Sequence, residues 1–100
     1  MRKTRKGSQA GNGRIPSIHL ELFEPNATDV YVAGSFNQWN PEATPLIALG
    51  NGKWSKELTL PAGRYEYRFV VDGHWITDPN GKETVPNPYG SANSILTIQG

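Results

Sequence analysis

The feature that most constrains the fold of this chain is a strict alternation of side chains from Arg64 to Val71. Aromatic and branched residues take every second position and charged residues take the positions between, namely Tyr65, Tyr67, Phe69 and Val71 against Arg64, Glu66 and Arg68. Because successive side chains of a strand point to opposite faces, this pattern predicts a strand with one core face and one outer face. The following Asp72-Gly73 favours a type I′ turn, whose two central residues both need positive φ. His74-Trp75-Ile76 is therefore expected to return as a short strand.

Weaker patterns of the same period predict further strands on both sides of this hairpin. The apolar positions that carry them are Ile18, Leu20 and Leu22, then Val30, Val32 and Phe36, and finally the run from Asn93 to Ile98. Between Lys53 and Leu60 the apolar row of Trp54, Leu58 and Leu60 is interrupted by Lys56, which is typical of a strand near a sheet edge. The irregular stretch of about fifteen residues after Ile76 indicates a binding loop or disorder.

No segment shows sustained helical periodicity, and glycine and proline punctuate the chain about every ten residues. Many short strands at this spacing predict an all-β fold of the β-sandwich type. A chain of 100 residues can build one hydrophobic core but not two, so residues 15–100 are expected to form a single domain.

Charge is distributed unevenly along the chain. Residues 1–14 carry five basic side chains and no acid, whereas residues 15–100 carry five basic and nine acidic side chains. The first segment is rich in glycine, serine and glutamine, so we expect a disordered basic tail. A nucleic-acid-binding fold places its basic patch on the folded surface, so nucleic acid is not the expected partner. A tail that binds polyanions remains the minority alternative to a solubilising linker.

Other function classes are disfavoured by residues that the chain lacks. It contains no cysteine, so it has neither disulfides nor a thiolate metal site. No apolar stretch approaches the ~20 residues of a membrane span, and no signal peptide is visible, so a cytoplasmic protein without membrane contact is expected. His19 and His74 lie in no metal-ligand spacing. The acids fall in turns or on outer faces, for example Asp72, Asp78 and Glu66, so neither catalysis, a metal nor a cofactor is predicted.

The tryptophans carry the best indication of binding. Trp39 follows a strand in Gly34-Ser35-Phe36-Asn37-Gln38-Trp39-Asn40-Pro41, and Trp75 stands two residues beyond the hairpin turn. An exposed indole ring offers a flat apolar surface for the C–H-rich face of a sugar, whose hydroxyls can then reach polar groups at the side. Such groups are available at Asn37, Gln38, Arg68, Tyr89 and Asn93. The alternative for both tryptophans is packing or cross-strand pairing, and Trp54 is expected in the core.

Three segments in order resemble a family of known modules. They are Val30 to Trp39, Pro61 to Pro79 with Trp54 before it, and Asn93 ahead of an apolar strand. Together they resemble a family 48 carbohydrate-binding module, which includes the glycogen-binding domain of the AMP-activated protein kinase β subunit and the early-set domain of isoamylase and branching enzymes. The similarity covers about residues 17–98. It implies an immunoglobulin-like, early-set β-sandwich that binds glycogen or starch without cleaving it.

The resemblance also implies roles for individual residues. Trp39 and Trp75 correspond to the two tryptophans that stack on glucose rings, and Asn93 corresponds to an asparagine that hydrogen-bonds the sugar. Arg68 stands where the family has a lysine, which keeps the donor but changes its geometry. Tyr89 stands where the family has a leucine that packs against the glucan.

The sequence therefore predicts an α-glucan or maltooligosaccharide as the ligand, bound at Trp39, Arg68, Trp75, Tyr89, Asn93 and Asn37. The alternative from another class is a β-sandwich that docks a protein partner, such as a glucan-metabolising enzyme or a kinase subunit. Whether the chain acts alone or as a piece of a longer protein stays open.

Overall fold

The computed structural model describes residues 16–99, which form eight strands. They are β1 (Ser17–Phe23), β2 (Val30–Gly34), β3 (Ile47–Gly50), β4 (Lys53–Thr59), β5 (Gly63–Val71), β6 (His74–Ile76), β7 (Thr84–Pro86) and β8 (Ala92–Ile98). The predicted basic tail at residues 1–14 lies outside the described residues. No helix in the described part of the chain is long and apolar enough to cross a membrane.

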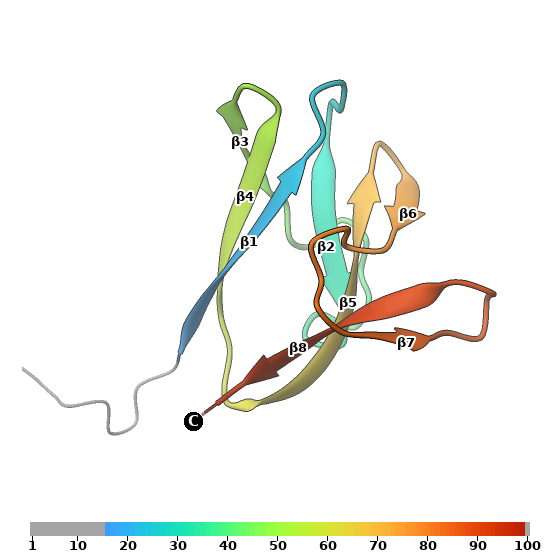
Figure 1. Ribbon diagram of the computed structural model, residues 1–100. Helices are drawn as coiled ribbons and strands as arrows, with labels where there is room; N and C mark the ends of the chain where they lie inside the picture. Colours follow the sequence, from blue (N-terminus) through green and yellow to red (C-terminus); the bar gives the residue numbers. More distant parts are fainter. Residues whose placement is uncertain (1–15, 100) are drawn as a thin grey trace, which may run out of the picture.

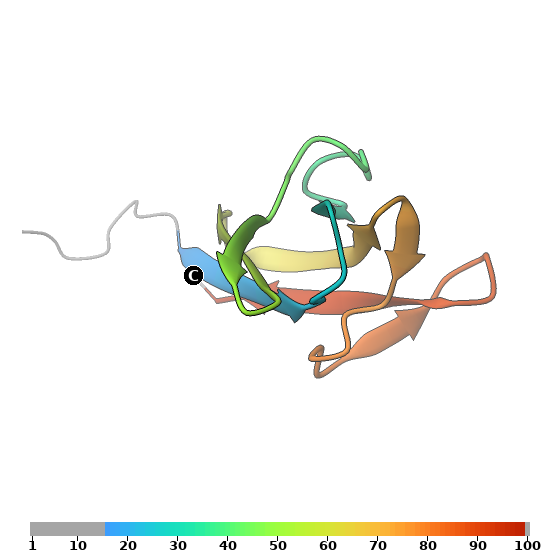
Figure 2. The same ribbon diagram turned by 90° about the horizontal axis from the view of Figure 1, so that it is seen from above.

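The strands form two antiparallel sheets that face each other (Figures 1 and 2). One sheet has the order β1-β4-β3, and the other has the order β2-β5-β8-β7 with β6 also paired to β5. The chain thus has the all-β, single-domain sandwich architecture predicted from its sequence. β5 is central because it pairs with β2 along one edge and with β8 and β6 along the other.

The core is built from the inward rows of both sheets, as the alternation predicts. Leu22 of β1, Val32 of β2 and Phe69 of β5 are at most 1% exposed. Tyr67 and Phe69 meet edge to face, with ring centroids 5.8 Å apart. Val70 belongs to the outer row of β5 yet is buried, because it lies opposite both Tyr31 and Trp75 in the strand register. The predicted inner face of β5 is therefore correct, and part of its outer face is also covered.

The hairpin between β5 and β6 has the predicted geometry. Asp72 and Gly73 have φ values of 49° and 86°, as a type I′ turn requires. The Asp72 carboxylate also accepts hydrogen bonds from the backbone N–H groups of Thr28 and Asp29, at 2.9 and 2.8 Å. These bonds tie the turn to the connection between β1 and β2.

The position of β4 corrects one sequence-based expectation. β4 lies between β1 and β3 and is not an edge strand. The sequence pattern missed β3, because its four residues are exposed and show no alternation. Lys56 lies opposite Leu20 and is half-buried, so its aliphatic stem can cover apolar surface while the ammonium reaches water. A lysine in an apolar row is therefore compatible with a central strand.

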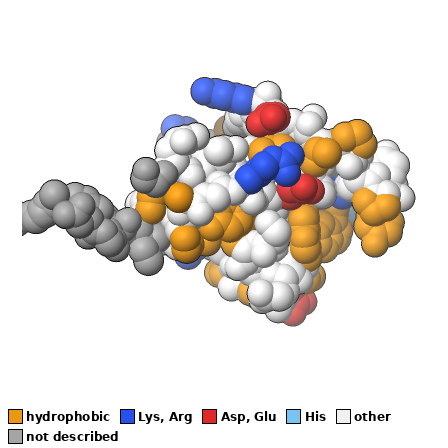
Figure 3. All heavy atoms as spheres, turned by 90° about the horizontal axis from the view of Figure 1, so that it is seen from below, with side chains coloured by type: hydrophobic (Ala, Val, Ile, Leu, Met, Phe, Trp, Pro, Cys, Tyr) orange, Lys and Arg blue, Asp and Glu red, His pale blue; other side chains and the backbone are white. Residues whose placement is uncertain are grey.

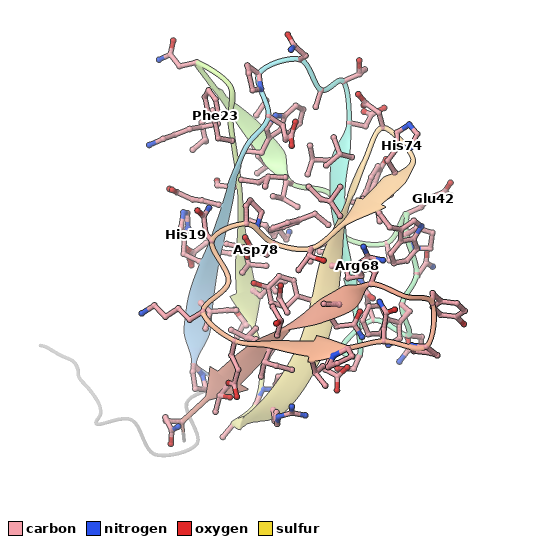
Figure 4. All side chains as sticks on the ribbon, turned by 45° about the vertical axis from the view of Figure 1, so that its right-hand side comes forward. His19, Phe23, Glu42, Arg68, His74 and Asp78 are labelled. Carbon is pink, nitrogen blue, oxygen red and sulfur yellow. The ribbon has the colours of Figure 1, made fainter. Side chains whose placement is uncertain are left out.

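The irregular stretch after β6 is an ordered connection that contains β7, and Asp78 fixes its start. Asp78 was expected in a turn with other outward acids, but it is only 7% exposed. Its carboxylate accepts a hydrogen bond of 2.5 Å from the Tyr67 hydroxyl and one of 2.8 Å from the Asn80 backbone N–H. The Asp78 backbone N–H donates to Ser94 Oγ at 3.2 Å. The Asp78-Pro79-Asn80-Gly81 turn is thus attached to β5 and β8, beside the core (Figure 4).

This contact leads to a pH-dependent prediction. Burial and the hydrogen bond to Asp78 raise the pKa of the Tyr67 phenol above its usual value of about 10. Below that usual value the phenol is neutral in both states, and its contribution to stability is fully present. At higher pH the unfolded chain loses this proton first, so the free energy of unfolding falls as pH rises. In Tyr67→Phe the decline between pH 9 and 11, measured by urea unfolding, is expected to be shallower than in the parent protein.

Tyr89→Phe is the matched control, because Tyr89 is 89% exposed and the same hydroxyl is removed there. The free energy of unfolding of Tyr89→Phe should decline with pH as steeply as that of the parent protein. Equally steep declines for the parent protein and Tyr67→Phe would contradict a raised pKa of the Tyr67 phenol.

Candidate functional site

A groove of about 750 Å³ lies on the outer face of the sheet that contains β5. Its lining residues are Trp39, Glu66, Arg68, Trp75, Asn87, Pro88, Tyr89 and Asn93. Five of the six predicted site residues are among them, and Asn37 is not. In Figure 3 hydrophobic side chains gather around a basic and an acidic group, on the side away from the grey N-terminal residues.

Trp39 reaches the groove from a tight turn after β2. Gln38 and Trp39 both have left-handed backbone conformations, with φ of 58° and 57°. Bulky residues avoid this region, so it is occupied only where surrounding contacts enforce it. The Trp39 backbone N–H donates to Gly34 O at 2.8 Å. A side chain at Gly34 would meet Glu66 O at 2.6 Å, so glycine lets the start of this turn lie against β5.

Asn37 holds this turn together from outside the groove. Its Nδ2 donates to Val32 O at 3.1 Å and to Thr44 Oγ1 at 3.0 Å. Its Oδ1 accepts from the Gly34 backbone N–H at 3.0 Å. The side chain expected to contact a ligand is therefore engaged within the protein, in the turn that carries Trp39.

The sequence left two roles open for Trp75, namely cross-strand pairing and contact with a ligand. It lies opposite Val70 in the β5–β6 register, and Val70 is only 4% exposed. The Trp75 residue is nevertheless 39% exposed and lines the groove. Trp75 thus pairs with Val70 across the hairpin and also presents part of its surface to the groove.

Arg68 connects three elements at the groove. It projects from β5, as labelled in Figure 4, and its Nη2 donates to Trp75 O at 3.3 Å and to Ser91 Oγ at 2.9 Å. These two bonds tie β6 and the loop between β7 and β8 to β5. Arg68 Nε is buried without a hydrogen-bond partner, and no carboxylate of the described residues forms an ion pair with this side chain.

Three polar side chains on the groove lining are linked in a row. Asn87 Nδ2 donates to Asn93 Oδ1 at 3.2 Å, and Asn93 Nδ2 donates to Glu66 Oε1 at 3.0 Å. Arg64 Nη1 lies 3.5 Å from Glu66 Oε2. Sequence reasoning did not assign Glu66 or Asn87 to the site. Glu66 could have been found, because it lies two residues before Arg68 and so shares its face of β5.

Tyr89 stands at the tip of the loop between β7 and β8. The loop is closed by Asn87, whose Oδ1 accepts from the backbone N–H groups of Tyr89 and Ser91 at 2.9 and 3.1 Å. Gly90 has a φ of 81°, which a residue with a side chain would adopt only with strain. Tyr89 is 89% exposed and lines the groove, so the loop contributes an aromatic side chain to it.

Trp54 differs from the other two tryptophans. It packs against the core, as expected, and its Nε1 donates to Glu24 O at 3.0 Å. It does not line the groove. Among residues 16–99 no group of three histidine, cysteine or acidic side chains is placed to hold a metal ion. The groove therefore offers aromatic surface, amides, one guanidinium and one carboxylate, which suits a neutral ligand rich in hydroxyl groups.

The sequence of this chain is similar to those of known proteins. The family model for the glycogen recognition site of AMP-activated protein kinase matches residues 22–100. The human 5'-AMP-activated protein kinase subunit beta-2 is 35% identical over 71 residues, which cover 71% of this chain and 25% of that protein. Subunit beta-1 from Sus scrofa is 37% identical over 71 residues, with 71% and 55% covered. The chain thus spans about a quarter of the length of most of the relatives that it matches here.

A solved structure has a similar fold. The maltogenic amylase from S. marinus aligns with a TM-score of 0.71 at 22% identity, over 84% of this chain and 14% of that chain. At this level of identity the likeness concerns the fold alone.

Proposed function

Because this chain belongs to the family of the glycogen recognition site of AMP-activated protein kinase, we propose that its groove binds an α-1,4-linked glucan without cleaving it. The observation that carries the proposal is the presence of Trp39, Trp75 and Tyr89 around one groove whose remaining lining is mostly polar. Glycogen, starch and maltooligosaccharides are the ligands of this chemistry.

The aromatic rings supply the apolar part of such binding. A pyranose presents a face of C–H groups, and burying it on an indole ring removes apolar surface from water on both sides. Trp39 comes from the turn after β2 and Trp75 from β6, so the two rings reach the groove from different elements. Rings held by separate elements are able to bind successive parts of one sugar chain.

The polar groups supply the specificity of the binding. Arg68 and Asn93 carry N–H groups that donate hydrogen bonds to a ligand. Sugar hydroxyls both donate and accept, so each of these groups finds a partner on an uncharged ligand. The groove is open to solvent on one side, and an open face buries little of a ligand, so the expected dissociation constant is about micromolar to millimolar.

Salt dependence distinguishes a neutral glucan from a polyanion. A glucan releases no counterions when it binds, so its affinity is expected to change less than about twofold between 50 and 200 mM salt. Binding through Arg2, Lys3, Arg5 and Lys6 would weaken about a thousandfold or more over that range if several phosphates were neutralised. Isothermal titration with maltoheptaose at both salt concentrations measures the difference.

Deletion of residues 1–14 is the matched control and is expected to leave maltoheptaose affinity unchanged. The glucan proposal would be abandoned if maltoheptaose failed to bind while heparin or nucleic acid bound in a salt-sensitive, tail-dependent manner.

A second candidate function, docking of a protein partner, is favoured by one observation. Phe23, Ile47 and Leu49 are 63%, 63% and 56% exposed. Phe23 and Ile47 lie opposite Lys53 and Ser55 of β4, on the outer face of the β1-β4-β3 sheet. Figure 4 shows Phe23 and Arg68 on different sides of the molecule. The apolar surface and the groove therefore belong to different sheets, and a partner on the first would leave the second free.

A further inference from the structure

The orientation of the Asn93 side chain is determined by its neighbours. Asn93 Nδ2 lies 3.0 Å from Glu66 Oε1. An ionised carboxylate can only accept hydrogen bonds, so it selects the NH2 end of the amide. On the other side Asn93 Oδ1 accepts from Asn87 Nδ2 at 3.2 Å. Both neighbours thus favour the same one of the two possible amide orientations.

The orientation of Asn87 is determined in turn by the loop. Its Oδ1 accepts from the backbone N–H groups of Tyr89 and Ser91, and a backbone N–H can only donate. The NH2 end of Asn87 must therefore point away from the loop and toward Asn93. Along the row from the Tyr89 loop to Glu66 each side chain therefore donates to the next: Asn87 donates to Asn93, and Asn93 donates to Glu66.

Ser91, whose backbone N–H donates to Asn87, also connects this loop to β5. Ser91 Oγ accepts from Arg68 Nη2 at 2.9 Å, and Arg68 shares the outer face of β5 with Glu66. Glu66, Asn93, Asn87 and Arg68 line the groove, and hydrogen bonds within the protein orient their polar groups. Groups that are ordered before the ligand arrives lose less conformational entropy on binding.

We propose that Glu66 and Asn87 are positioning residues, which set the Asn93 amide so that its NH2 group faces Glu66 and its second N–H remains for a sugar hydroxyl. This inference rests on the proposed function of the groove. It adds Glu66 and Asn87, which affect binding through Asn93. Neither needs to touch the ligand. At position 66 a carboxylate excludes the reversed orientation of Asn93, whereas an amide could donate as well as accept and would leave the selection to Asn87 alone.

Glu66→Gln tests the first residue with little change in size. It is expected to weaken maltoheptaose binding about fivefold, which corresponds to the loss of roughly one hydrogen bond. Asn87→Asp tests the second, since a carboxylate still accepts from both loop N–H groups but cannot donate to Asn93. It is expected to weaken binding by a similar factor. Glu83→Gln is the control, because Glu83 is exposed and does not line the groove; it should leave affinity unchanged.

A double-mutant cycle with Asn93→Ala distinguishes positioning from direct contact. If Glu66 acts through Asn93, Glu66→Gln has no further effect on affinity once Asn93 is alanine. A fivefold loss that persists in the Asn93→Ala background would overturn the proposal, because Glu66 would then contact the sugar itself. Unchanged affinity in Glu66→Gln would overturn it as well.

A measurement without ligand separates this proposal from the function of the groove. In ¹H–¹⁵N spectra of the free protein, Glu66→Gln is expected to shift the side-chain NH2 signals of Asn93 and Asn87, and Glu83→Gln is not. Unmoved signals would overturn the positioning role whatever the ligand is. Shifted signals together with no maltoheptaose binding by the parent protein would retain the positioning role and refute the glucan function.

Discussion

Replacing Trp75 by alanine is expected to weaken maltoheptaose binding roughly five- to a hundredfold, and Trp39→Ala should have an effect of the same size. Each substitution removes a ring that lines the groove, with a loss of apolar contact on the order of 1 to 3 kcal/mol. Since 1.4 kcal/mol corresponds to a factor of ten in affinity, this range gives the expected weakening. Titration calorimetry with maltoheptaose measures it directly.

Both variants should remain folded, which far-ultraviolet circular dichroism and urea unfolding can verify. Trp75 is 39% exposed and Trp39 is half-buried, so neither removal opens a cavity in the main core. The assignment is wrong if both variants bind as the parent protein does. It is also wrong if Trp54→Ala abolishes binding in a protein that is still folded.

Trp54→Ala is expected to have the opposite profile, with a loss of stability of about 3 kcal/mol and little change in affinity per folded molecule. Trp54 packs against the core cluster from β4 and donates to Glu24 O. Its removal leaves a cavity, for which losses of 3 to 5 kcal/mol are typical, and the half-buried position favours about the lower value. For a small domain this is a large part of the total free energy of unfolding.

Urea unfolding of Trp54→Ala at neutral pH gives this value, and binding is then measured at low temperature, where the folded form predominates. Trp54→Phe retains most of the apolar volume and should recover part of the stability. A stability equal to that of the parent protein would show that Trp54 does not support the core.

The parts of the fold that were predictable are those in which local pattern and tertiary packing agree. The alternation in β5 and the Asp72-Gly73 turn determine a hairpin by themselves, and the structure has it at those residues. β3 was not predictable, because its four residues are exposed and pair with only one strand. With β3 missed, Lys56 was interpreted as a sign of an edge, although β4 lies in the middle of its sheet.

The groove was predictable from residue type more than from pattern. Trp39, Trp75 and Tyr89 are aromatic residues near turns, and the resemblance to a known family selected them. The hydrogen bonds from Arg68 and Glu66 of β5 were not predictable, because their partners Ser91 and Asn93 lie 23 and 27 residues later in the sequence. Asn37 was predicted to contact the ligand, and residue type alone did not indicate that its amide bonds to Val32 and Thr44.

Asp78 shows a related limit of sequence reasoning. Asp78-Pro79-Asn80-Gly81 has the composition of a solvent-exposed turn, and the acid was placed with outward groups on that basis. Its carboxylate is buried because the Tyr67 hydroxyl, eleven residues earlier in the chain, reaches it from β5. A buried acid is tolerated where such hydrogen bonds replace water.

The most direct test of the central claim is a maltoheptaose titration of the complete chain followed by ¹H–¹⁵N spectra of the three tryptophan indole groups. The account predicts that the indole signals of Trp39 and Trp75 shift progressively with ligand, together with the backbone signals of the Tyr89 loop. The signal of Trp54, whose Nε1–H is bonded to Glu24 O, should stay in place. Shifts confined to Trp54 or to the surface around Phe23 and Ile47, or no shift at millimolar maltoheptaose, would contradict glucan binding in this groove.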